Sequence, residues 1–164
     1  MNKLITDKEE EKRRLQALAE YRILGTEPES CYDDITQIAA RTCHVPISLM
    51  TLVDKDRQWF KSKVGFQTSE TRRDWSFCTH AIKENIPLII NDAFLDKRFV
   101  NNPLVTGDPK IRFYAGFPLK NNDGNKLGTL CVIDRKPGSL DEEQRFIMEL
   151  LAKQIVSFLE LRKR

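Results

Sequence analysis

The sequence has few cysteines, few histidines and little excess of charge, and each shortage argues against a class of protein. Its 4 cysteines stand far apart without a Cys-x-x-Cys pair, which disfavours a zinc site or a disulfide framework. Its 27 basic and 24 acidic residues are mixed along the chain, leaving a net charge of +3. Such mixing is typical of a solvated surface rather than a nucleic-acid footprint. We therefore expect no metal and no nucleic-acid partner.

Long apolar runs are also lacking. No run approaches the roughly 20 residues that cross a bilayer, and residues 1–5 lack the apolar core of a secretory signal. The sequence therefore predicts a cytoplasmic protein without a membrane partner. Its 164 residues, 40% hydrophobic and 31% charged, are enough for one domain with a buried core.

Helices are predicted at both ends of the chain. Apolar spacing predicts one over residues 9–24 and a second over 28–43, begun by a capping box in residues 26–29, Thr-Glu-Pro-Glu. A second capping box, in residues 139–142, Ser-Leu-Asp-Glu, is expected to begin the final helix. The apolar face of that helix is wider than one sheet contact needs.

Between the helices, the sequence predicts an antiparallel sheet. The predicted strands are 47–54, 58–64, 87–90, 113–119 and 126–133. The Asp-Gly pair in 121–125 predicts a tight hairpin between the last two. Residues 65–74 are expected to form a polar loop, and residues 91–112 a long crossing segment with one helical turn near 96–100. This order predicts an α+β fold: a five- or six-stranded antiparallel sheet with helices on one face and irregular segments on the other.

Several motifs together resemble one sensory family. They are Arg57-Gln-Trp-Phe-Lys61, Ser76-Phe-Cys-Thr-His80, Asn102-Pro-Leu-Val-Thr106, Arg112-Phe-Tyr-Ala-Gly-Phe-Pro-Leu119 and the run from Leu127 to Gln144. The sequence resembles the GAF domain, especially the version ahead of bacterial histidine kinases and diguanylate cyclases. The resemblance predicts a single GAF domain over 13–164, including its flanking helices, after an N-terminal extension over 1–12. It also implies that the first and last helices bundle on one sheet face, while irregular segments and short helices enclose a small-molecule pocket on the other.

Candidate ligand-binding residues fall into three groups. The aromatic group is Trp59, Trp75, Phe77, Phe99, Tyr114 and Phe117. The polar group is Asp92, Arg98 and Asn101, and the third group is Cys78, His80 and Cys131. Plain core packing is the alternative for the aromatics, and turn capping is the alternative for the polar residues. Alternation allows only one of Trp59 and Phe60 to face the pocket.

Known ligand motifs of the family are missing or displaced. Cys43-His44 looks like the dipeptide that holds a bilin in phytochrome-like GAF domains, but that cysteine belongs in residues 91–112, which contain none. Where cyclic-nucleotide GAF domains carry Asn-Lys, Phe and Asp-Glu, this chain has Asp134-Arg135, Leu140 and Gln144-Arg145. The cofactor is therefore left unknown, and no catalytic residue is assigned.

The leading hypothesis is a non-catalytic sensor, not an enzyme, in bacterial two-component signalling. It binds an unknown small molecule and reports occupancy through its terminal helices, as a homodimer or to a separate kinase or cyclase output protein. One alternative is a thiol reductase of the free methionine sulfoxide reductase type, acting through Cys78 and Cys131. The other is a dimerisation module without a ligand.

Overall fold

The computed structural model describes residues 6–164, so the first five residues of the predicted extension, and the expectation about a secretory signal there, lie outside it. The structure contains a six-stranded antiparallel sheet in the order β3-β2-β1-β6-β5-β4. Its strands are β1 (Ile47–Val53), β2 (Arg57–Val64), β3 (Glu70–Arg72), β4 (Leu88–Ile90), β5 (Phe113–Lys120) and β6 (Lys126–Asp134). The predicted α+β fold is therefore confirmed.

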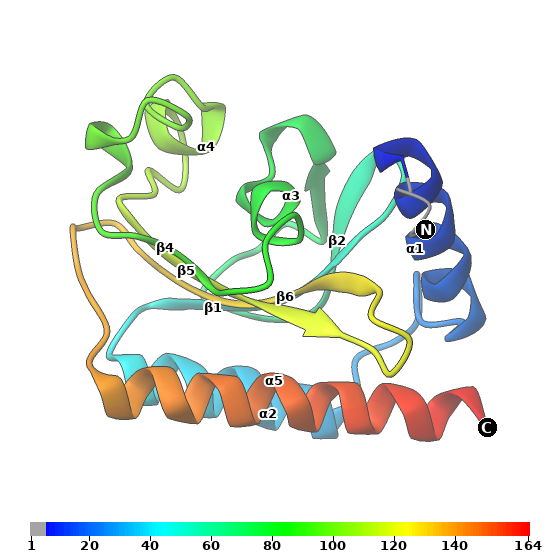
Figure 1. The fold of residues 1–164 in the computed structure, drawn as a ribbon. Helices are drawn as coiled ribbons and strands as arrows, with labels where there is room; N and C mark the ends of the chain where they lie inside the picture. The colour runs from blue at the N-terminus through cyan, green and yellow to red at the C-terminus, as the bar shows by residue number, and fades with distance from the viewer. Residues whose placement is uncertain (1–5) are drawn as a thin grey trace.

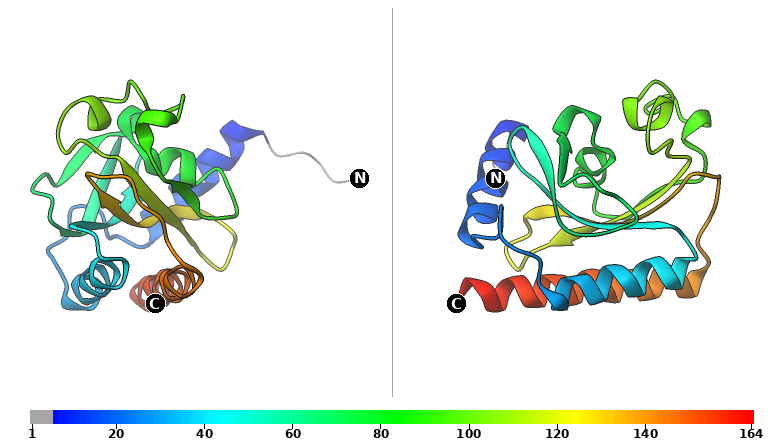
Figure 2. Two further views of the ribbon diagram at one scale, coloured as in Figure 1. Left: turned by 90° about the vertical axis from the view of Figure 1, so that its left-hand side faces the viewer. Right: turned by 180° about the vertical axis from the view of Figure 1, so that it is seen from behind.

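Helices cover both faces of this sheet, in different ways. The α-helices are α1 (Asp7–Glu20), α2 (Ser30–Cys43), α3 (Phe77–Ala81), α4 (Pro103–Thr106) and α5 (Glu142–Lys163), and the 3-10 turns are η1 (Arg73–Trp75) and η2 (Ala93–Leu95). Figures 1 and 2 show α2 and α5 side by side beneath one face, with α3, α4 and irregular segments above the other. The start of α5 lies beside the end of α2, where Gln144 Nε2 donates to Thr42 O over 3.0 Å. The two long helices therefore run antiparallel.

The sheet separates two apolar cores. All seven residues of β1 are buried, as expected for a central strand. Because side chains alternate along the strand, Met50 and Leu52 point into the core between the sheet and the long helices α2 and α5. Leu49 and Val53 point into the core between the sheet and the irregular segments. The sheet is therefore one rigid layer that contacts both the irregular segments and the long helices.

The first helix differs from the expectation in its end and its position. It ends at Glu20, four residues earlier than predicted. It stands at one end of the sheet (Figure 1), and α2, rather than α1, is the helix that lies beside α5. The predicted capping box in 26–29 does not form, because the Thr26 hydroxyl donates to Ile23 O over 2.6 Å and also accepts from Lys61 Nζ. Glu29 precedes α2 without a capping hydrogen bond from its side chain.

Three further local expectations need correction. The last helix is capped by Asp141 with Gln144, instead of Ser139 with Glu142. The predicted polar loop at 65–74 contains β3, which pairs with β2 at the sheet edge. In the crossing segment, residues 96–100 form only a turn, and the helix is α4, which Asn102 caps through its side chain and Pro103 begins. No helix within residues 6–164 is long and apolar enough to span a membrane.

Candidate functional site

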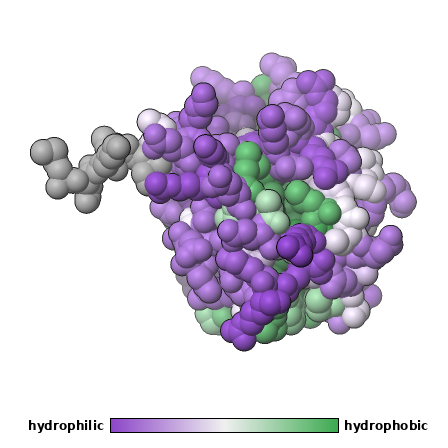
Figure 3. Space-filling view, turned by 90° about the vertical axis from the view of Figure 1, so that its right-hand side faces the viewer, coloured by the Kyte–Doolittle hydropathy of each residue, from purple (hydrophilic) through white to green (hydrophobic). Residues whose placement is uncertain are grey.

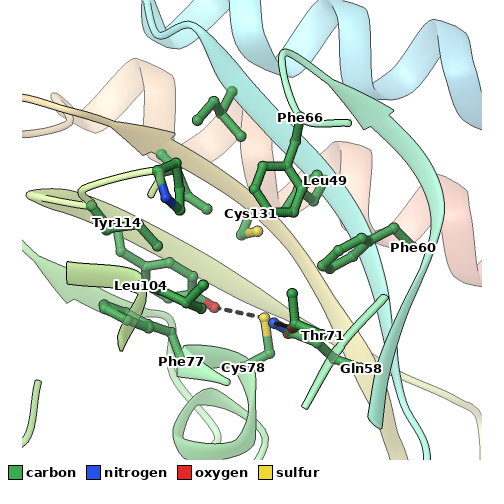
Figure 4. A pocket seen from close by; sticks show the side chains of 14 residues that line it. Leu49, Gln58, Phe60, Phe66, Thr71, Phe77, Cys78, Leu104, Tyr114 and Cys131 are labelled. Atoms are coloured by element: carbon green, nitrogen blue, oxygen red, sulfur yellow. Dashed lines mark hydrogen bonds between the residues drawn. The ribbon is translucent and has the colours of Figure 1, made fainter. Parts of the chain in front are cut away.

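A small cavity lies between the sheet and the segments above it (Figure 4). Its lining is mainly apolar and comes from β1, β2, β3, β5, β6, α3, α4 and the loops beside them. The space open to the centre of a water molecule is about 20 Å³. A cavity needs roughly 10–15 Å³ by this measure to hold one water. In this conformation the cavity is therefore large enough only for a molecule close to water in size.

Cys78 is the centre of the polar groups in this lining. Its Sγ atom lies 3.1 Å from the Tyr114 hydroxyl and 3.0 Å from Thr129 Oγ1. Thr129 Oγ1 lies 3.1 Å from Thr51 Oγ1 on the neighbouring strand. Cys131 lies two residues further along β6 than Thr129, on the same face of the sheet, and lines the same cavity as Cys78. Three sheet strands, β1, β5 and β6, and the short helix α3 thus bring these five polar side chains to one buried region.

Local structure explains why Cys78 points at the sheet. The Ser76 hydroxyl accepts from Thr79 N over 3.2 Å, which caps α3, and donates to Gln58 Oε1 over 2.7 Å. The same serine therefore starts the helix and ties it to β2. Cys78 then lies in the first turn of α3, facing the sheet, and is 2% exposed.

The surroundings shift the pKa of Cys78 and the pKa values of Cys131 and Tyr114 in opposite directions. Burial raises the pKa of Cys78, but hydrogen bonds from four neighbours outweigh it and lower the pKa to about 6. Those neighbours are Cys131, Thr129, Thr51 and Tyr114. Burial and the hydrogen bond to Cys78 hold the pKa of Cys131 well above its usual value, and burial does the same for Tyr114. Cys78, with the Tyr114 and Thr129 hydroxyls within hydrogen-bond distance, is therefore the thiol of the cluster that is best placed to carry a negative charge.

An aromatic wall closes one side of the site. Phe77 stacks on Phe99 with ring centroids 4.1 Å apart, and the Phe77 and Tyr114 centroids are 5.1 Å apart. His80 packs edge-on against Phe99 at 4.9 Å. Burial, followed by the charges of Lys83 and Arg98, lowers the pKa of His80. Of the predicted residues, the structure thus places Phe77, Cys78, Tyr114 and Cys131 in the cavity lining. Phe99 packs against Phe77, and His80 packs against Phe99, outside that lining.

Other predicted aromatics lie elsewhere. Trp59 and Phe117 pack in the core on the helix side of the sheet, away from the cavity. Phe60 lines the cavity instead of Trp59, in keeping with the alternation along β2. Trp75 is half-buried and packs against the core between the sheet and the irregular segments. Trp59 and Phe117 are therefore core residues, for which packing was the stated alternative.

The predicted polar residues of the crossing segment also point away from the cavity. Asp92 caps η2 by accepting from Phe94 N over 3.0 Å, and Arg98 forms an exposed ion pair with Asp96 at 2.8 Å. Asn101 is exposed. Asp92 and Arg98 thus have the capping and tethering roles that were the alternative to ligand binding.

Sequence reasoning missed the two threonines of the cluster. Thr51 and Thr129 are paired in register across β1 and β6, and both are fully buried. The available signal was the presence of hydroxyl residues inside mainly apolar strands, Ser48 and Thr51 in β1 and Thr129 in β6. Within residues 6–164, no three or more His, Cys, Asp or Glu side chains converge in a way that could hold a metal ion.

Comparison with known proteins gives a consistent result. The family model described as "GAF domain" matches residues 27–158. The chain is 37% identical over 150 residues to the cyclic di-GMP phosphodiesterase PA2567 of Pseudomonas aeruginosa. The matched region covers 91% of this chain and 26% of that protein. The chain therefore spans about a quarter of the length of that relative.

Solved structures share the fold at low identity. The GAF domain of an Acinetobacter phosphoenolpyruvate-protein phosphotransferase superposes with a TM-score of 0.66 at 14% identity, covering 96% of this chain and 95% of that one. Free methionine-R-sulfoxide reductase from Neisseria meningitidis, solved with its substrate, gives 0.66 at 14% identity, covering 99% and 96%. These likenesses show the fold alone.

The prediction that the chain is not an enzyme is corrected by these comparisons. A protein 37% identical to the chain is named a cyclic di-GMP phosphodiesterase, which points to an enzyme. The prediction relied on the residues of this stretch, whereas the relative is a much longer protein.

Proposed function

Since the chain belongs to the GAF domain family, we propose that it is the signal-sensing module of a cyclic di-GMP phosphodiesterase, whose output it adjusts. The 37% identity to such an enzyme carries this proposal. The module extends over 13–164, preceded by a short extension. Part of that extension belongs to α1, where Glu11 Oε2 pairs with Arg14 Nε at 2.9 Å.

The input site is the cavity around Cys78. Metabolite pockets usually measure roughly 300–1,000 Å³, far more than the space here. The input we propose is therefore a molecule of very few atoms that reaches the polar cluster. The closed cavity does not accommodate methionine sulfoxide, so the geometry gives the reductase alternative no support.

A chain of contacts connects the sheet to the end of α5. Tyr114 and Thr129, both in contact with Cys78, belong to β5 and β6, whose hairpin carries Asn121. The Asn121 amide donates to the Tyr21 hydroxyl over 3.2 Å, and this hydroxyl donates to Glu160 Oε1 over 2.6 Å. A change in the position of β5 and β6 therefore reaches the C-terminal turns of α5.

A second set of contacts holds the same end of α5. Arg162 Nε donates to Tyr21 O over 2.9 Å, and its Nη2 donates to Arg22 O over 2.9 Å. Arg162 also pairs with Glu29 at 3.2 Å, and Glu29 in turn pairs with the buried Lys61 of β2 at 2.7 Å. The end of α5 is thus attached to the segment between α1 and α2, and α5 is the output element of the proposal.

The outer face of α5 supports a homodimer. Phe146, Leu150 and Leu161 are 60%, 43% and 60% exposed, and their spacing places them on one helix face, opposite the buried one. Figure 3 shows hydrophobic residues at the lower edge of the molecule, where α2 and α5 lie. A second copy that covers this face removes the apolar stripe from water.

Light scattering at micromolar concentration tests this output surface. We expect the wild-type protein to have twice the mass of one chain. A variant with Phe146→Glu and Leu150→Glu is expected to have the mass of one chain, because each charge would be buried in the interface. Leu95→Glu is the matched control, since Leu95 is 84% exposed on η2, on the other side of the sheet, and should leave the dimer intact. A monomeric wild-type protein contradicts the dimer.

A further inference from the structure

Two thiols share one cavity in a chain whose other two cysteines lie elsewhere. Cys78 and Cys131 both line the cavity, whereas Cys43 packs in the core on the helix side of the sheet and the half-buried Cys31 packs against that same core. Figure 4 shows both sulfur atoms on the lining of the same cavity. This arrangement brings together a potential nucleophile and a second thiol that can react with its product.

The donors around Cys78 favour a reactive sulfur. Tyr114 OH and Thr129 Oγ1 lie 3.1 and 3.0 Å from it, so negative charge on the sulfur is stabilised without a cationic neighbour. The thiolate is the form of cysteine that attacks electrophiles. Apolar side chains form most of the remaining lining, which limits entry to small uncharged molecules.

We propose that Cys78 and Cys131 form a peroxide-reactive pair, in which hydrogen peroxide entering the cavity oxidises Cys78 and Cys131 then closes a disulfide with it. Hydrogen peroxide is uncharged and little larger than water, which matches a cavity of about 20 Å³. This inference deepens the proposed function and rests on it for its signalling consequence, because it names the input of the same site.

The reaction balances in two steps. The Cys78 thiolate attacks one peroxide oxygen and the O–O bond breaks, giving the sulfenic acid of Cys78 while the leaving hydroxide takes a proton to become water. The sulfur of Cys131 then attacks Cys78, the S–S bond forms, the S–O bond breaks and a second water leaves with the Cys131 proton. Two thiols and one peroxide thus give one disulfide and two waters. A cellular dithiol reverses the change by exchange.

Alkylation after peroxide treatment tests the pair directly. The reduced protein is treated with one equivalent of hydrogen peroxide, quenched, unfolded and alkylated with iodoacetamide, and its intact mass is measured. We expect alkylated thiols to fall from the 4 of the sequence to two, with peptide mapping that joins Cys78 to Cys131. The loss should be at least about tenfold faster than oxidation of Cys43, whose pKa burial raises to about 11.

Single substitutions separate the two thiols. Cys131→Ser should stop at the sulfenic acid, detected as a dimedone adduct after unfolding, whereas Cys78→Ser should keep all its remaining thiols. Cys43→Ser is the matched control and should still form the disulfide. Peptide mapping of the wild-type protein needs no variant, so the result stands even if Cys78→Ser does not fold.

Oxidation confined to Cys31 or Cys43, or a Cys78 that reacts no faster in the folded protein than in urea, would overturn the pair. The proposed sensory role is tested separately, by light scattering for the dimer and by hydrogen exchange on α5. A failure of the thiol chemistry is therefore distinguishable from a failure of the sensory role.

Discussion

Gly128→Ala is expected to lower the free energy of unfolding by about 3 kcal/mol or more. A Cβ atom at this position would lie 1.9 Å from Thr51 O and 2.8 Å from Leu52 Cα. Both neighbours are backbone atoms of β1, so no side chain can turn away to make room. The strain falls on the pairing of β1 with β6 at the centre of the sheet.

The same substitution should disturb the site, because Thr51 and Thr129 pair across these two strands. Urea denaturation measures the effect on stability. Gly138→Ala is the matched control, since its Cβ would meet only side-chain atoms of Phe113, the nearest at 3.3 Å, and we expect a cost below about 1 kcal/mol. Equal stability of the two variants would show that β1 and β6 are not so tightly apposed at Gly128.

Phe99→Ala is expected to cost about 3–5 kcal/mol of unfolding free energy. The Phe99 side chain is fully buried, stacks on Phe77 at 4.1 Å and contacts His80 edge-on. Its removal leaves a void beside the Cys78 site, because the sheet beneath cannot collapse to fill it. Chemical denaturation followed by fluorescence measures this loss.

Phe94 provides the control for that experiment within the same segment. It is 49% exposed, and the Arg112 guanidinium lies 3.5 Å from the centroid of its ring. Phe94→Ala should therefore cost only about 0.5–1 kcal/mol. A Phe99→Ala variant as stable as Phe94→Ala would mean that the crossing segment does not pack on the site as described.

The sequence predicted the sheet well because its strands are long, apolar and separated by strong turn signals. β1, β2, β5 and β6 lie within one or two residues of their expected bounds. The cap of α5 was misplaced because Ser139 with Glu142 and Asp141 with Gln144 both have the required three-residue spacing. Spacing alone does not decide between two overlapping capping boxes.

The candidate site was predicted only in part because it depends on contacts distant in the sequence. Thr51 and Thr129 are 78 positions apart in the sequence and come into contact only because the register of β1 with β6 pairs them. Local sequence patterns do not reveal such a pairing. Alternation showed that Trp59 and Phe60 face opposite ways, yet it could not tell which faces the cavity. The size of the cavity depends on how side chains of many elements fit together, so the volume could not be foreseen.

Hydrogen exchange on α5 is the most direct test of the claim that the cavity reports to this helix. The wild-type protein and Cys78→Ser are compared before and after peroxide, with intact mass recording oxidation of the same samples. The account predicts faster amide exchange over residues 156–163 in oxidised wild-type protein and no change in Cys78→Ser. Oxidation at Cys78 with exchange changes confined to α3 and β6, and an unaltered α5, would contradict it.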